Sequence, residues 1–261
     1  MQALIDTHCH LDTHYVPDPA AVMARAREAG VGGFVVIGVG AELTAAREAV
    51  ALSARMPRTV AAVVGLHPHD ASAMDDAMFA ELAELSRRPE VVAVGEIGLD
   101  YHYDHSARGL QRDAFARLIA LAREVGKPIV VHTREAAADT LALLESESAR
   151  DVGGIIHCFS EDMAFAERAW NLDFDVSFSG IVTFKSARAV HEVAANAPIA
   201  RVHVETDSPY LAPVPMRGKP CEPAFVAYTA KRVAELRGIS LEALAEAAHE
   251  NAERRFSRSF E

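Results

Sequence analysis

The feature that most restricts the fold of this chain is a regular alternation of short apolar runs and alanine-rich segments. The runs are rich in valine and isoleucine, and the segments after them have helical spacing. Successive runs start about 20–40 residues apart, which suits a strand, a crossover and a helix. Runs that are apolar throughout are typical of parallel strands covered on both faces. The predicted strands are residues 3–6, 33–38, 60–65, 91–96, 128–132, 154–157, 174–178 and 201–206.

Amphipathic helices are predicted between and after these strands. In residues 113–125, Phe115, Leu118, Ile119 and Ala122 form one apolar stripe, and Gly126 is the expected C-cap. Similar stripes occur at 20–29, 43–54, 79–86, 136–145, 225–236 and 241–256.

About eight strand–helix units predict an α/β fold, a TIM (β/α)₈ barrel. An open doubly wound sheet is the alternative, but that fold usually has a glycine-rich phosphate turn after its first strand. Here the first strand runs into His8, Cys9 and His10. Because half of the residues are hydrophobic and no linker interrupts the alternation, we expect a single domain over residues 1–261.

Charge and cysteine content restrict the partners and the compartment. The formal net charge of −11 argues against a broad basic face that holds duplex DNA, but not against an enzyme that binds a strand end with the help of metal ions. We see no secretory signal and no apolar run long enough to span a membrane. Three scattered cysteines do not make a disulfide framework, so a cytoplasmic protein is expected. A monomer is the default expectation.

Residues that bind metals recur where the predicted strands end. The C-terminal strand ends of a barrel meet at one face, where the active sites of this fold lie. His8 and His10 are two apart, so in an extended segment both point the same way, and Cys9 points the other way. Imidazole and carboxylate ligands suit Zn, Mn or Mg, and two such ions can clamp a phosphodiester. The predicted ligands are His8, His10, Glu96, His132, His157 and Asp207.

Other polar residues near strand ends have simpler explanations. We expect His69, His102 and His105 to be surface or capping residues, and no catalytic role for His14, His191, His203 or His249. Asp100 is expected to be a turn residue or an N-cap. Phe159 is expected to pack in the core or rim.

The chain resembles the TatD family of metal-dependent deoxyribonucleases over almost its whole length. The motifs that carry the resemblance are IDTHCHLD at 5–12, GLHPH at 65–69, VGEIGLDY at 94–101, HTREA at 132–136, HCFS at 157–160, ETDSPYL at 205–211, RGKP at 217–220 and NAERRF at 251–256.

The resemblance implies an amidohydrolase-like barrel that uses two divalent ions (Mg, Mn or Zn) to cut DNA, often from the 3′ end of a single strand. Glu96 has two carboxylate oxygens and can bridge the ions, and Asp207 can accept a proton from a metal-bound water. The resemblance places His67 beside the scissile phosphate. The implied substrate contacts are Glu205, which could equally stand behind a metal ligand, and Arg217 and Lys219. Tyr101 lies near the expected mouth, together with Tyr103 and Tyr210.

Two departures from the family pattern put substrate preference in doubt. Glu161 stands where the family usually has glycine, and Cys221 where it usually has asparagine. The competing functions are an aminoacyl-tRNA deacylase or another amidohydrolase-type carbonyl hydrolase, in which the same ions would polarise a carbonyl group. A scaffold without turnover is a third possibility that the intact ligand set disfavours.

Overall fold

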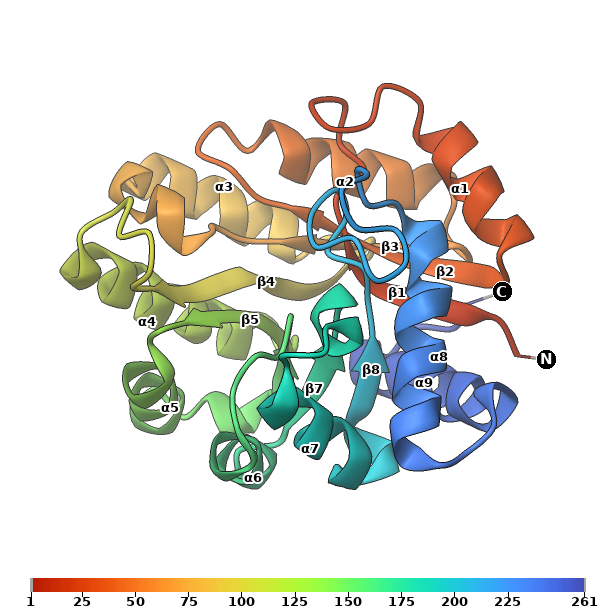
Figure 1. Cartoon of the computed structure of the whole chain (residues 1–261). Coiled ribbons are helices and arrows are strands. Elements are labelled where there is room, and N and C mark those ends of the chain that lie inside the picture. The colour runs from red at the N-terminus through yellow and green to blue at the C-terminus, as the bar shows by residue number, and fades with distance from the viewer. Residues whose placement is uncertain (1, 261) are drawn as a thin grey trace.

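The chain folds into a barrel of eight parallel strands, as the sequence predicts. The computed structural model describes residues 2–260. Neighbouring strands pair in sequence order from the first to the eighth, and helices surround them (Figure 1). The strands are β1 Leu4–Cys9, β2 Val31–Gly38, β3 Val60–Val64, β4 Val91–Asp100, β5 Ile129–Arg134, β6 Gly154–Ile156, β7 Phe174–Phe178 and β8 Val202–Val204.

The last strand meets the first just beyond its own end, and this closes the barrel. Cys9 pairs with Ser208 in a parallel bridge, and the His10 amide donates to the Ser208 carbonyl at 2.9 Å. The buried Asp6 carboxyl accepts from the amide and the hydroxyl of Thr206. Burial raises the pKa of Asp6 to about 8, and the hydrogen bonds of this carboxyl to Thr206 link β1 to the segment after β8.

Helices follow the strands, and most lie within a few residues of their predicted positions. They are α1 Pro19–Glu28, α2 Thr44–Arg55, α3 Asp76–Ser86, α4 Arg108–Val125, α5 Ala137–Ser146, α6 Met163–Asn171, α7 Arg188–Asn196, α8 Val226–Arg237 and α9 Leu241–Phe256. The sequence reading missed α6 and α7. Short 3₁₀ helices complete the chain at Pro68–Ala73, Ala149–Asp151, Gly180–Thr183, Ile199–Arg201 and Pro223–Phe225.

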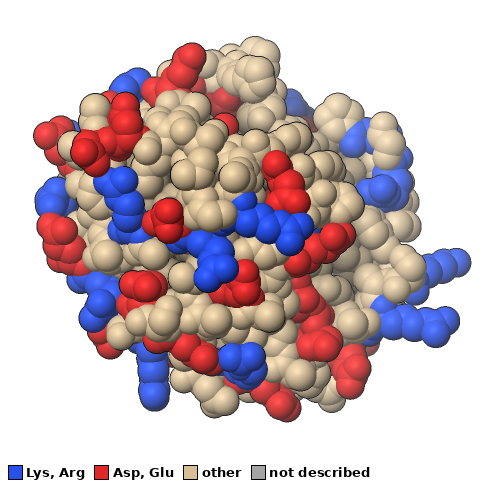
Figure 2. All heavy atoms as spheres, turned by 90° about the vertical axis from the view of Figure 1, so that its left-hand side faces the viewer, with Lys and Arg blue, Asp and Glu red and all other residues tan. Residues whose placement is uncertain are grey.

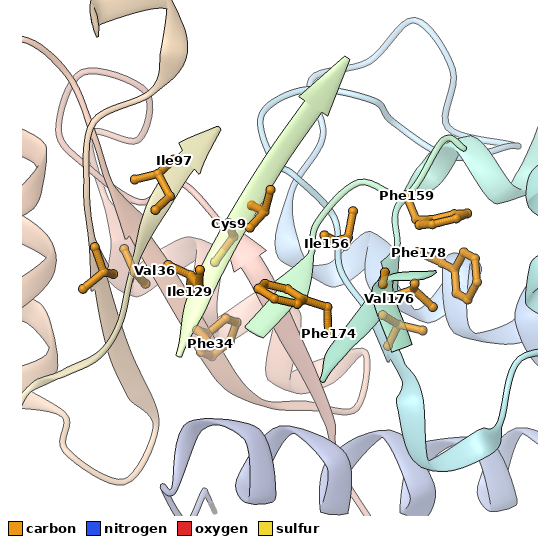
Figure 3. Packing of buried hydrophobic residues seen from close by; sticks show 14 of the residues in the cluster. Cys9, Phe34, Val36, Ile97, Ile129, Ile156, Phe159, Phe174, Val176 and Phe178 are labelled. Atoms are coloured by element: carbon orange, nitrogen blue, oxygen red, sulfur yellow. The ribbon is translucent and has the colours of Figure 1, made fainter. Parts of the chain in front are cut away.

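The apolar core has two main parts. The larger one lies between strands and helices, where Phe34, Phe174 and Phe178 are fully buried (Figure 3). Phe159 belongs to it as well, because its ring packs edge-to-face on Phe178 with centroids 6.1 Å apart. The expectation that Phe159 is a packing residue is therefore confirmed.

The second part fills the barrel interior at the end that lies away from the C-terminal ends of the strands. Strand residues that alternate with those of the larger cluster, such as Ile5 and Val63, pack there against Ala252 and Phe256 of α9 and against Phe260. The C-terminal helix thus closes one end of the barrel and leaves the other end for a site. Within residues 2–260, no helix has the length and apolar character that a membrane crossing requires.

Candidate metal centre

The six predicted metal ligands, contributed by five strands or strand ends, come together around Glu96. Their side chains form overlapping groups in which possible ligand atoms lie within 4.8 Å of one another: His8 with Glu96 and His157, and His8 with His10 and Asp207. A third group adds His67 and His132 to Glu96. The barrel therefore gathers residues that are up to about 200 positions apart in the chain.

Glu96 is the centre of this arrangement. Its Oε1 lies 2.8 Å from His157 Nε2 and 2.9 Å from His132 Nδ1, and its Oε2 lies 3.4 Å from His8 Nε2. The two oxygens of one carboxylate therefore face imidazoles on both sides, as a carboxylate that bridges two cations would.

The backbone around Glu96 explains why glycines flank it. Gly98 has a φ of 145°, and a Cβ there would lie 1.9 Å from the His132 carbonyl oxygen. Glycine therefore lets β4 run close enough to β5 for Glu96 and His132 to meet.

Two further carboxylates contact His157 and His132 at the ring nitrogens that point away from Glu96. Glu205 Oε1 lies 3.2 Å from His157 Nδ1 and accepts from the Cys158 amide at 2.7 Å. Asp100 Oδ2 lies 3.1 Å from His132 Nε2. In metal sites a ligating histidine usually donates its other ring N–H to a carboxylate, which fixes the ring and its tautomer. With those ring protons directed at Glu205 and Asp100, His157 Nε2 and His132 Nδ1 are the nitrogens that face Glu96 and could bind a cation.

The buried polar atoms of this cluster fit a bound cation. His8 is completely buried, and neither of its ring nitrogens has a hydrogen-bond partner. Such atoms are costly unless something binds them. Among the described residues that line the cavity above the cluster, Arg134 is the one lysine or arginine, so the buried carboxylates have little positive charge from side chains nearby.

The pKa shifts of Glu96 and His157 also indicate that the buried carboxylates of the cluster attract positive charge. Burial alone would raise the pKa of Glu96, but the neighbouring imidazoles, His157 foremost, outweigh it and hold this pKa well below its usual range. Burial likewise would lower the pKa of His157, but Glu96 and Glu205 raise it well above normal. Divalent cations would satisfy these carboxylates without protonating the histidines.

His67 and His69 lie beside the centre on the segment after β3. His67 Nε2 is 3.5 Å from Glu96 Oε1, so the predicted catalytic histidine does face the cluster. His69 Nε2 lies 3.1 Å from the same Asp100 oxygen that faces His132. Asp100 also accepts from two amides of the turn after β4, as its predicted turn role requires. The expected turn role of Asp100 is therefore confirmed, but the contacts of Asp100 and His69 with the cluster were not expected.

An open cavity of about 1010 Å³ lies over the cluster. His10, Glu96, His132, His157 and Asp207 all contribute to its wall, while His8 lies behind them. The wall also includes side chains that sequence reasoning did not select. They come from the β1–α1 loop, from α2 and from the end of β5, and include Asp12, His14, Tyr15, Glu48 and Arg134.

Several residues expected to hold substrate lie away from the lining. The Tyr101 hydroxyl donates to Asp139 at 2.7 Å, and Tyr103 lines the cavity instead. Arg217 stacks on the Phe184 ring at 4.3 Å, and Lys219 is exposed beside it. Glu205 lies behind His157, so a contact with substrate does not fit its complete burial.

The two departures from the family pattern also lie outside the lining. Cys221 is buried and packs with Ala212 and Phe225. Burial raises the pKa of its thiol, as for an inert core cysteine. Glu161 is half-buried beside Ser160, which does line the cavity.

A closed parallel barrel with buried histidines and carboxylates at the carboxyl ends of its strands is typical of metal-dependent hydrolases. Comparison with known proteins is more specific. Residues 5–257 match the family model described as TatD related DNase. The chain belongs to this TatD family, as the motifs in its sequence indicate.

Individual relatives are similar over nearly the full chain. The uncharacterized metal-dependent hydrolase YabD of Bacillus subtilis is 41% identical over 97% of this chain and 98% of its own. The 3′-5′ ssDNA/RNA exonuclease TatD of Pantoea vagans is 35% identical over 92% of this chain and 94% of its own. The crystal structure of YjjV, a TatD homologue from Escherichia coli, superposes with a TM-score of 0.90 at 30% identity, covering 97% of this chain and 98% of that one.

Proposed function

We propose that this metal-dependent hydrolase is a 3′-5′ exonuclease that removes nucleotides from single-stranded DNA. The observation that carries the proposal is the position of Glu96 between two sets of imidazoles at the floor of an open cavity. The Pantoea vagans relative, named as an ssDNA/RNA exonuclease, supports the choice of substrate.

We assign the metal ligands to two sites that share Glu96. His8, His10 and Asp207 would hold one divalent ion, and His132 and His157 the other. When bound, such ions polarise phosphoryl oxygens and make a nearby water molecule more acidic. Mg, Mn and Zn all suit the mixed nitrogen and oxygen donors.

The side chains around these sites have separate tasks. Asp207 Oδ1 lies 3.7 Å from both His8 Nε2 and His10 Nε2, and its carboxylate faces the cavity, where it can accept a proton from the attacking water. His67 lines the cavity and can donate a hydrogen bond to a phosphate oxygen or to the departing 3′ oxygen. Glu205 and Asp100 keep the imidazoles in position.

The test is release of mononucleotides from a 5′-labelled single-stranded oligonucleotide with Mg²⁺ or Mn²⁺. We expect stepwise shortening from the 3′ end that EDTA abolishes and that Glu96→Gln reduces by several orders of magnitude. Glu84→Gln, at an exposed position on α3, is the matched control and should retain full activity. No cleavage by the wild-type protein with any divalent ion would refute the proposal.

One observation favours the alternative of a carbonyl hydrolase. The cavity wall carries seven carboxylates, which repel a polyanion: Asp12, Glu42, Glu48, Asp70, Glu96, Asp100 and Asp207. A panel of esters and amides, including aminoacyl-tRNA, assayed beside the oligonucleotide would reveal this activity. Faster turnover of a carbonyl substrate would replace the nuclease proposal.

A further inference from the structure

Exposed tyrosines gather at the mouth of the cavity. Within residues 2–260, Tyr15, Tyr103, Tyr210 and Tyr228 are the large aromatic side chains with substantial exposure, at 40%, 51%, 48% and 37%. The first three line the cavity, whereas Tyr228 lies on α8 away from it. Exposed aromatic surface concentrated around one opening is typical of a ligand contact.

Tyr15 and Tyr210 form a pair from opposite ends of the chain. Tyr15 belongs to the loop between β1 and α1, and Tyr210 to the segment after β8. Their hydroxyls are hydrogen-bonded at 2.7 Å, and their rings meet edge-to-face with centroids 5.8 Å apart. Both rings are still about half exposed, so much of their surface faces the mouth.

The pair stands next to the proposed metal centre. The centroid of the His10 ring lies 5.9 Å from that of Tyr15 and 6.3 Å from that of Tyr210. The Tyr210 amide donates to the Asp207 carbonyl at 2.9 Å, so the position of the pair is tied to a proposed ligand. In a nucleotide only the sugar separates the base from its phosphate. A phosphate over the metals therefore brings a base within reach of these rings.

The loop that carries Tyr15 is anchored to a neighbouring helix. The amide and hydroxyl of Thr13 each donate to a different oxygen of Glu48 on α2, both at 2.7 Å. The Tyr15 amide donates to the Asp12 carbonyl at 3.1 Å. These bonds fix the ring before substrate arrives, which reduces the entropy lost on binding.

The charge of the cavity makes contacts to bases more important. Arg134 is the one lysine or arginine among the described lining residues, against seven carboxylates. Binding of a strand along its phosphates needs several cations, whereas stacking on aromatic rings needs none. Contacts to the sugar–phosphate backbone alone would leave the substrate poorly held.

We propose that Tyr15 and Tyr210 form a stacking platform for a nucleobase adjacent to the scissile phosphate. The platform makes an unpaired base, and not only a phosphodiester, part of what the enzyme recognises. This inference rests on the proposed function, because it assigns the part of the substrate that the cavity binds beside the metal centre.

The first test leaves the protein unchanged. Single-stranded oligonucleotides carry one abasic tetrahydrofuran residue at the 3′-terminal, penultimate or third position. We expect kcat/KM of the wild-type enzyme to fall about 5- to 150-fold for one of these positions, which is the range for loss of one base–aromatic stack. Equal kcat/KM for the intact and all abasic oligonucleotides would overturn the platform while leaving the exonuclease proposal intact.

The second test combines the substrates with variants. Tyr210→Ala and Tyr15→Ala should lose a similar factor on intact DNA, mainly through KM, and lose little more on the sensitive abasic substrate. Tyr210→Phe and Tyr15→Phe keep the rings and should retain most activity, and Tyr228→Ala is the control at an exposed tyrosine elsewhere. Alanine variants that discriminate between intact and abasic DNA as strongly as the wild type would contradict the inference.

A third readout does not depend on turnover. The fluorescence of 2-aminopurine deoxyriboside 5′-monophosphate falls when its base stacks, and this mononucleotide contains no diester to cleave. We expect saturable quenching by the metal-loaded wild type, weakened at least 5-fold by Tyr210→Ala. Absence of quenching together with normal oligonucleotide hydrolysis would also overturn the platform. Absence of hydrolysis on every oligonucleotide counts against the proposed function instead.

Discussion

At the residue scale, the centre depends on carboxylates that touch histidines rather than substrate. Glu205 is completely buried and faces His157 Nδ1, so its charge favours the tautomer whose Nε2 is free to bind a cation. Asp100 faces Nε2 of the His132 ring in the same way, so that Nδ1 is the nitrogen of this ring that is free to bind a cation. Loss of either carboxylate should therefore weaken the binding of a cation by the histidine that it holds.

Glu205→Gln tests this positioning role. Glutamine keeps the size and can still accept from the Cys158 amide, but it loses the charge that holds the His157 ring. We expect the affinity for Mn²⁺, measured by titration calorimetry, and kcat to fall about 10- to 100-fold. Glu192→Gln, at an exposed position on α7, is the control. Unchanged Mn²⁺ affinity in a folded Glu205→Gln protein would remove this residue from the centre.

The six-residue set could be predicted from sequence because each member ends an apolar run or lies a few residues beyond it. The roles of His69 and Asp100 could not. They depend on β4 continuing to Asp100 in register with β5, where Asp100 pairs with Arg134. The predicted strand stops at residue 96, because Gly95 and Gly98 interrupt the apolar pattern beyond Val94.

At the element scale, a buried ion cluster joins β7, β8 and α9. The Asp175 carboxylate is fully buried and accepts from His203 at 3.0 Å, from Arg255 at 2.8 and 3.0 Å and from Arg201 at 3.0 Å. Burial alone would raise the pKa of Asp175, but His203 and Arg255 outweigh it and hold this pKa far below its usual range. No catalytic role was expected for His203, and its contact with Asp175 is structural.

Asp175→Asn should destabilise the fold by about 3–5 kcal/mol at pH 7, because it leaves buried cations without their partner. Since the folded pKa is depressed, this stabilisation is present above the unfolded pKa of about 4 and is lost as pH falls below it. Urea unfolding of the two proteins should therefore show a difference that shrinks below pH 4. The account would be contradicted if the difference in the free energy of unfolding stayed constant from pH 7 to pH 3. It would also be contradicted if Asp175→Asn were no more destabilising than Asp113→Asn at an exposed position.

Helices with long apolar stripes were predictable, and the two shortest were not. α6 and α7 have nine residues each and bury only three side chains apiece, namely Phe165, Ala166 and Ala169 in one and Val190, Val193 and Ala194 in the other. A nine-residue helix is shorter than the window of about 11 residues over which helical spacing is normally read, so its apolar stripe is easily overlooked. Contacts with the rest of the barrel supply most of the stability of such short helices. The start of α4 at Arg108 was missed for another reason, because its first turn contains Gly109 and an exposed leucine, Leu110, that does not belong to the buried stripe.

At the scale of the whole molecule, surface charge offers little general attraction to nucleic acid. Acidic and basic side chains are intermingled over the face shown in Figure 2, and the net charge is −11. Affinity for a nucleic acid strand must therefore come from the cavity, through the proposed metal centre and the proposed tyrosine platform. The barrel could be predicted because the alternation of strands and helices repeats along the sequence. The path of residues 211–222 could not be predicted, and it carries Arg217 and Lys219 away from the cavity lining.

The central claim is that Glu96 joins two cation sites. Anomalous diffraction from a crystal soaked in Mn²⁺ tests it most directly. We predict two strong peaks on either side of the Glu96 carboxylate, one beside His8, His10 and Asp207 and the other beside His132 and His157. A map from a fully soaked crystal with no peak in contact with Glu96 would contradict the account.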